Sequence, residues 1–187
     1  MTIAENTADG ATRLYQSLRH YWHPVAYTSD LGDGPMKVRL LDQDLVIVRL
    51  AGQVCAFYDL CVHRGTPLSL GFVDGDRLRC AYHGWAYDCS GACTEIPSVR
   101  GGRIPGRARL RRYQIAERCG LIWVCLEEQP RFDLPEFVHF ADPDFRVLQV
   151  PAGRVAHQRR RPGVDRVPQV VVRARRRDRV TGARSCR

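Results

Sequence analysis

The stretch CVHRGTPLSLG at residues 61–71, followed by CAYHGW at residues 80–85, decides the fold of this chain. Each stretch supplies one cysteine and one histidine, and sixteen residues separate His63 from Cys80. A glycine stands within two residues of each histidine, as a tight turn favours. Two short loops that each present a thiol and an imidazole can clamp one metal centre, with Cys61, His63, Cys80 and His83 as its ligands.

The mixed ligand spacing favours a two-iron two-sulfur cluster of the Rieske type, in which two thiolates hold one iron and two imidazoles hold the other. Zinc is the alternative, because two cysteines and two histidines also make a tetrahedral structural site. Zinc ribbons and fingers usually pair cysteine with cysteine and histidine with histidine, whereas each motif here contains one of each. A third interpretation is that the four are unrelated core residues. Two metal-ligand spacings and two glycine turns would then have arisen by coincidence.

The two motifs resemble the Rieske domain of bacterial ring-hydroxylating and demethylating oxygenases. The likeness extends to YWHPVA at residues 21–26 and to residues 104–124, so it covers about residues 20–128. The vanillate demethylase and phenoxybenzoate dioxygenase group is similar. The resemblance implies an electron-transfer module of an oxidoreductase of aromatic compound catabolism, supplied with electrons by an NAD(P)H-dependent reductase or a ferredoxin. A stand-alone Rieske ferredoxin or binding module is the alternative, although such carriers seldom have segments similar to residues 21–26 or 104–124.

The same resemblance implies supporting residues around the cluster. Arg64, Tyr82 and Trp85 match the family motif and would support the cluster from outside the ligand set, although simple core packing also explains Trp85. Respiratory Rieske proteins carry an additional cysteine at the positions of Thr66 and Tyr82 and join the two in a disulfide. The chain therefore resembles the oxygenase and ferredoxin types, and we expect a potential nearer the low end of the Rieske range of roughly −150 to +300 mV.

The oxygenase family also binds a mononuclear Fe(II) through two histidines and one carboxylate. Beyond His83 this chain contains only His139 and His157, which are too far apart for the family's usual motif. We interpret His139, near Asp142 and Asp144, as a solvated side chain. The sequence thus predicts no mononuclear iron site and no catalytic residue, so enzymatic activity of this chain alone is uncertain and an aromatic substrate belongs to a full-length relative.

The hydrophobic pattern predicts an all-β fold, a small antiparallel sandwich with two cluster-binding hairpin loops at one end. A short amphipathic helix is expected over residues 12–22. We divide the chain into a helical lead-in at 1–20, a Rieske domain at 21–128, a linker toward a missing catalytic domain at 129–151, and an arginine-rich tail at 152–187. Strands are expected at 36–41, 44–50, 53–58, 77–80 and 121–126.

The positive charge is concentrated at the carboxyl end. Residues 152–187 contain twelve arginines and two aspartates, whereas residues 1–151 contain 17 basic and 18 acidic residues. The tail has no aromatic residue and is expected to be disordered. Because the chain contains 28 arginines and a single lysine, Lys37, a GC-rich gene is indicated, and the tail is interpreted as an out-of-frame or truncated product. A natural basic tail that docks an acidic partner, or binds nucleic acid non-specifically, is the alternative.

The remaining features concern compartment and cysteines. The sequence has no run of eighteen apolar residues and no signal peptide, which predicts a cytoplasmic protein without membrane contact. Eight cysteines could indicate a secreted disulfide scaffold. Because Cys55 and Cys125 fall within apolar runs, we expect buried thiols there instead. Cys89 and Cys93 are interpreted as hairpin residues rather than as a redox pair.

Overall fold

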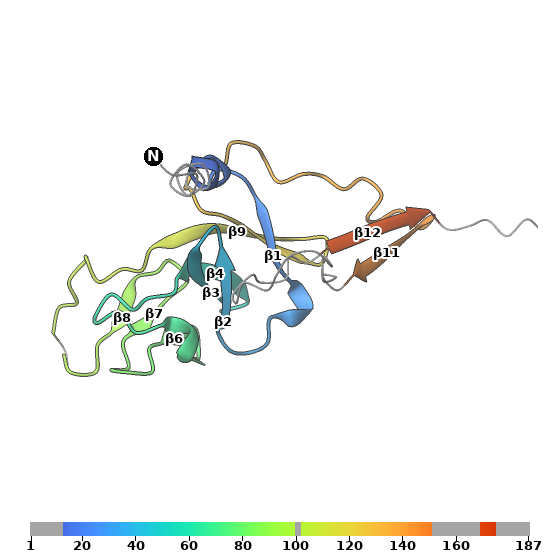
Figure 1. Ribbon diagram of the computed structural model, residues 1–187. Helices are drawn as coiled ribbons and strands as arrows, with labels where there is room; N and C mark the ends of the chain where they lie inside the picture. The colour runs from blue at the N-terminus through green and yellow to red at the C-terminus, as the bar shows by residue number, and fades with distance from the viewer. Residues whose placement is uncertain (1–12, 100–101, 151–168, 175–187) are drawn as a thin grey trace, which may run out of the picture.

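The computed structural model describes residues 13–99, 102–150 and 169–174 of the chain, and most of the elements are strands (Figure 1). The larger of the two central sheets has six antiparallel strands in the order β1-β10-β9-β4-β3-β2. Its members are β1 (His23–Tyr27), β2 (Met36–Leu40), β3 (Gln43–Leu50), β4 (Gln53–Tyr58), β9 (Arg112–Arg118) and β10 (Leu121–Cys125). The predicted strands of this sheet are therefore confirmed to within a residue at either end.

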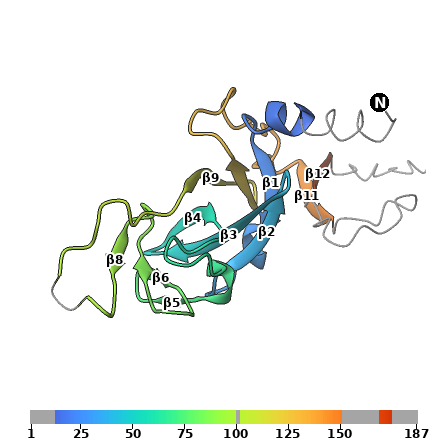
Figure 2. The same cartoon turned by 60° about the vertical axis from the view of Figure 1, so that its left-hand side comes forward.

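The smaller central sheet has four antiparallel strands in the order β5-β6-β7-β8. Figures 1 and 2 both show it at the left-hand end of the molecule. The first cysteine–histidine loop precedes β5 and the second connects β6 to β7, so this sheet positions both. Its strands are β5 (Phe72–Asp74), β6 (Arg77–Arg79), β7 (Ala86–Tyr87) and β8 (Cys93–Glu95).

Strand β3 separates two buried clusters because its successive side chains point to opposite faces. Val46 and Val48 pack with residues of β4, β6, β7 and β8, which joins the two sheets into a sandwich. Leu45 and Ile47 pack on the other face with residues of β1, β2, β9 and β10. The edge strands β1 and β2 contact one another, so the larger sheet curls around this second cluster. The expected all-β sandwich is confirmed.

Two segments differ from the sequence-based expectations. The amino-terminal helix covers residues 13–18 of the described chain and ends before the predicted residue 22, because a turn at residues 19–20 leads directly into β1. Within the segment predicted to be disordered, β12 (Gln169–Ala174) pairs antiparallel with β11 (Phe145–Val150). A run of three valines at 170–172 gives β12 a high β propensity that the arginine content concealed. The predicted tail otherwise lies outside the described residues.

The β11–β12 hairpin lies at the opposite end of the molecule from β6, β7 and β8 (Figures 1 and 2). Two short 3-10 turns, η1 (Thr28–Asp30) and η2 (Leu68–Leu70), complete the described elements, and η2 belongs to the first cysteine–histidine loop. Among the described residues, no helix is long and apolar enough to cross a bilayer.

Candidate metal centre

The two predicted ligand loops have the same main-chain construction. In the first, the amide of Gly65 donates to the Cys61 carbonyl at 2.8 Å, and the amide of Cys61 donates to the carbonyl five residues later at 2.8 Å. In the second, the amide of Gly84 donates to the Cys80 carbonyl at 3.0 Å, and the amide of Cys80 donates to the carbonyl five residues later at 2.9 Å. Both glycines have positive φ, 68° and 69°, which favours glycine over any residue with a Cβ.

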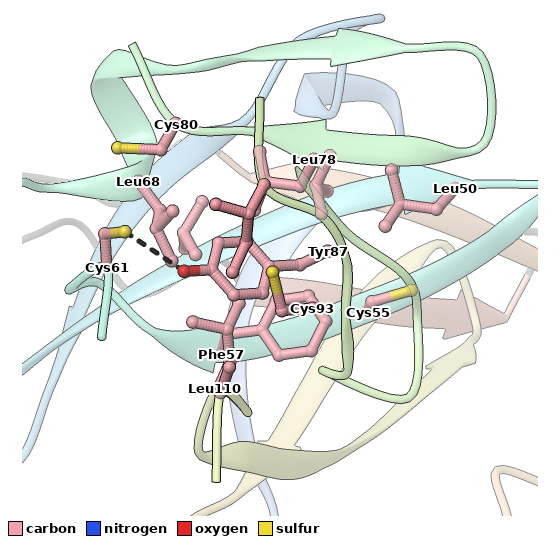
Figure 3. Close-up of a cluster of buried hydrophobic side chains, with 14 residues drawn as sticks. Leu50, Cys55, Phe57, Cys61, Leu68, Leu78, Cys80, Tyr87, Cys93 and Leu110 are labelled. Carbon is pink, nitrogen blue, oxygen red and sulfur yellow. Dashed lines mark hydrogen bonds between the residues drawn. The ribbon is translucent and has the colours of Figure 1, made fainter. Parts of the chain in front are cut away.

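The two cysteines form the buried side of the site. Cys61 and Cys80 are 3% and 2% exposed and belong to the cluster that joins the sheets, where Figure 3 shows them beside one another. Burial raises the pKa of the Cys61 thiol, and the neighbouring Cys80 raises it further, although a hydrogen bond from Tyr87 acts in the opposite direction. Burial of two neighbouring thiolates is therefore costly unless a cation compensates their charge.

The two histidines form the exposed side. The rings of His63 and His83 lie with centroids 4.6 Å apart, and both side chains reach solvent. Partial desolvation lowers the pKa of the His63 imidazole, and the charges of His83 and Arg64 lower it further. The neutral imidazole, which is the form that binds metals, is thereby favoured.

The residues that were predicted to support the cluster occupy different positions relative to the imidazoles. The indole of Trp85 stacks on His63 with centroids 4.6 Å apart and planes 6° apart, while also packing against the buried cluster. Tyr82 is 61% exposed and its ring contacts His83 at a centroid distance of 3.8 Å. Arg64 is exposed and acts on His63 through its charge.

Sequence reasoning missed Tyr87, which contacts a predicted ligand. Its side chain is fully buried, and its hydroxyl lies 3.1 Å from the Cys61 sulfur (Figure 3). Burial raises the pKa of this hydroxyl strongly, so the group stays protonated and can donate to a thiolate. The position follows the second motif by two residues, but nothing in the sequence shows that its hydroxyl reaches the first.

Polar side chains hold each loop against the sheets. The buried carboxylate of Asp59 accepts bonds from the Ser69 amide at 2.7 Å and the Ser69 hydroxyl at 2.6 Å, which fixes the end of the first loop. Arg79 donates to the Gly84 carbonyl at 2.8 Å and also binds Asp74 at 2.7 Å. The guanidinium therefore ties the second loop to the β5–β6 hairpin.

The prediction that Cys55 is a buried free thiol is wrong. Cys55 on β4 forms a disulfide with Cys89 in the β7–β8 turn, where the two Cα atoms lie 5.6 Å apart. The contact arises because the turn folds over β4, which sequence spacing does not show. Cys93 and Cys125 are free and buried, as expected for Cys125. Cys89 and Cys93 do lie in one hairpin, but they are not bonded to each other.

The remaining predicted residues lie outside this site. His139 is exposed, with its ring stacked on Phe145 and its Nδ1 3.7 Å from Asp142. His157 lies outside the described residues. Within the described ranges, no three or more histidine, cysteine, aspartate or glutamate side chains gather as a site for a single metal ion. What the structure brings together is one pair of thiols and one pair of imidazoles.

The structure is a β-sandwich whose two glycine-closed loops present paired thiols and paired imidazoles, the donor set expected of an iron–sulfur protein with mixed ligands. The Rieske [2Fe-2S] domain family matches residues 21–114, and the chain belongs to that family. Its cofactor is a two-iron two-sulfur cluster, whose mixed donor chemistry the paired side chains fit.

The relatives include demethylases and a dioxygenase subunit. The chain is 42% identical over 140 residues to methylxanthine N1-demethylase NdmA of Pseudomonas putida, a match covering 70% of this chain and 39% of that protein. It is 38% identical over 142 residues to the phenoxybenzoate dioxygenase subunit alpha of Ectopseudomonas oleovorans, covering 72% and 34%. The solved structure of Pseudomonas putida NdmA with caffeine superposes with a TM-score of 0.68 at 39% identity, covering 75% of this chain and 43% of that one. The chain thus spans about two-fifths of the length of NdmA.

Proposed function

We propose that this chain is the electron-transfer module of a Rieske oxygenase. In this proposal Cys61 and Cys80 hold one iron and His63 and His83 hold the other, within a domain covering residues 21–128. The observation that carries it is the separation of the donors, since the thiols are buried together and the imidazoles are exposed together. A two-iron cluster with different ligands on each iron requires that separation.

The cluster, once bound, supplies a one-electron carrier. The protein's part is to bury the thiolate side, to keep the imidazole side in contact with solvent, and to hold both loops rigid through Asp59 and Arg79. Trp85 fixes the plane of the His63 ring by stacking on it. The exposed histidine edge is the part of the site that an electron acceptor can approach most closely.

The relatives suggest the chemistry of the whole protein. One is named a methylxanthine demethylase and another a phenoxybenzoate dioxygenase, so the substrate class would be an aromatic or heteroaromatic ring. In the whole protein the reaction would be hydroxylation or demethylation at a mononuclear iron, and we propose no ligands for that iron in this chain. Electrons would come from an NAD(P)H-dependent reductase or a ferredoxin in the cytoplasm.

The test is anaerobic reconstitution of the full chain with iron and sulfide. The expected result is two irons and two sulfides per chain and an electron paramagnetic resonance signal typical of histidine-ligated clusters after dithionite reduction. His83→Cys should lower the potential, because it adds a negative charge to the cluster. His139→Ala removes a histidine outside the site and should leave signal and potential unchanged. A chain that takes up only zinc under these conditions would refute the proposal.

A further inference from the structure

One segment of the domain carries a high density of positive charge. Residues 96–116 contain six arginines and no aspartate or glutamate, although residues 1–151 as a whole are nearly neutral. The nearly neutral net charge of residues 1–151 therefore conceals a local excess of positive charge at residues 96–116. The structure describes five of the six arginines, and all five side chains are exposed: Arg103, Arg107, Arg109, Arg111 and Arg112, here called the arginine ridge.

The ridge differs from five of the other described arginines in how its charge is compensated. Five arginines elsewhere each form an ion pair with a carboxylate: Arg19, Arg39, Arg49, Arg77 and Arg79. For the ridge, no carboxylate of the described residues lies within ion-pair distance. Two of its members contact neutral groups instead, since Arg109 donates to the Ser90 carbonyl at 2.8 Å and Arg111 lies over the Tyr113 ring at 5.4 Å.

The ridge is joined to the β7–β8 hairpin, which follows the second ligand loop. The Cys93 amide donates to the Ala108 carbonyl at 2.9 Å, and the Leu110 amide donates to the Gly91 carbonyl at 2.7 Å. These bonds attach the ridge to the β7–β8 hairpin. The Leu110 side chain belongs to the buried cluster that contains Tyr87 and Cys61 (Figure 3). The segment that carries the ridge and the thiolate side of the site therefore share one packed cluster of side chains.

The surface beside the ridge is hollowed. A cavity of about 670 Å³ is lined by Arg109, Arg111 and Arg112 together with Glu127 and Glu128. The charge of Glu127 is neutralised by Arg19, whose Nε lies 2.6 Å from its carboxylate. The balance in the cavity remains positive, so it suits an acidic side chain of a partner.

We propose that the arginine ridge docks an acidic electron-donor protein. The inference rests on the proposed function, since a donor is needed only if the cluster is present. One electron would leave the donor and reduce one ferric ion of the cluster, with no bond made or broken. Complementary charge accelerates such an encounter without requiring tight binding. A nucleic acid is the other anionic partner that a positively charged surface attracts, and the test below treats it as a separate outcome.

The test measures electron transfer from an acidic plant-type [2Fe-2S] ferredoxin, reduced beforehand, to the full reconstituted chain by stopped-flow absorbance. The ridge variant is Arg103→Gln/Arg107→Gln/Arg112→Gln, which spares the two arginines that contact Ser90 and Tyr113. We expect its second-order rate at low ionic strength to fall by about tenfold or more, with a weaker dependence on salt. Arg131→Gln, an exposed arginine outside the ridge, should change the rate less than about twofold.

Dithionite reduction of each variant separates the two proposals. Equal cluster content and complete dithionite reduction in all variants, with a slow ferredoxin reaction only in the ridge variant, would support docking at the ridge. The same ferredoxin rate in the ridge variant and the wild-type chain would overturn docking but leave the proposed function standing. A ridge variant that loses affinity for a short DNA duplex yet keeps the wild-type ferredoxin rate would also overturn it. A chain that binds no cluster would refute both proposals.

Discussion

Replacing Tyr87 by phenylalanine should lower the reduction potential of the cluster. The hydroxyl lies 3.1 Å from the Cys61 sulfur and the ring is fully buried, so Tyr87→Phe removes one hydrogen bond and keeps the packing. Reduction adds negative charge to the cluster, which strengthens a bond donated to one of its sulfurs. The bond therefore stabilises the reduced form more than the oxidised form, and its loss favours oxidation.

The magnitude follows from the strength of such bonds. A hydrogen bond to a neutral group contributes about 0.5–1.5 kcal/mol net, and one to a charged group about 1.5–3 kcal/mol. The potential reports only the difference between the two redox states, which we take as about 1 kcal/mol from those ranges. For a one-electron couple, 59 mV corresponds to about 1.4 kcal/mol, so the potential should fall by about 40 mV.

Protein-film voltammetry at fixed pH measures this shift directly. Tyr113→Phe is the matched control, because Tyr113 is also buried and its hydroxyl donates to Gln43 at 2.9 Å, away from the ligands. The control should leave the potential within error of the wild-type value. An unchanged or higher potential in Tyr87→Phe, with full cluster content, would show that the hydroxyl does not donate to the cluster.

Three further changes test the fold. Arg49 lowers the pKa of Glu117 below its usual 4.5, so the pair stabilises the fold fully above that pH, and the gain is lost as pH falls through the lowered pKa. Glu117→Gln should therefore cost about 0.5 kcal/mol at pH 7 and progressively less as pH falls below 4.5, by urea unfolding. A Cβ at Gly71 would meet a backbone carbonyl of β6, so Gly71→Ala should cost about 3 kcal/mol, while Gly106→Ala, with open space, should cost much less. Replacing both disulfide cysteines by serine should cost about 4 kcal/mol for a bridge spanning 34 residues, and dithiothreitol should no longer affect stability.

The features that the sequence predicted are those whose signals are local. The ligand residues stand within four positions of one another in each motif, and the strand around Val46 is recognisable from its β-branched run. Contacts between distant segments gave no such signal. The Tyr87 hydroxyl reaches a sulfur 26 residues away, and the partner of Cys55 lies 34 residues away. Both contacts depend on how the smaller sheet stacks on β4.

The distribution of charge gives a second reason why the sequence predicted the molecule only in part. Summing charges over residues 1–151 indicated a neutral domain, which is correct as a total. Whether an arginine is compensated depends on the carboxylates beside it in space, as for Arg79 with Asp74, and not on the total. The uncompensated arginines at 103–112 became apparent only when the ion pairs elsewhere in the sandwich were known.

The main-chain closure of the two loops has a consequence for protein engineering and for evolution. Each loop is held by amide–carbonyl bonds around a glycine, and neither closure uses a cysteine or histidine side chain. None of the main-chain bonds that close either loop would therefore be lost if the donor side chains were changed. We therefore expect that donors can be exchanged at these positions while the frame persists, so that one backbone serves all-thiolate, mixed or imidazole-rich centres with a wide range of electron affinities.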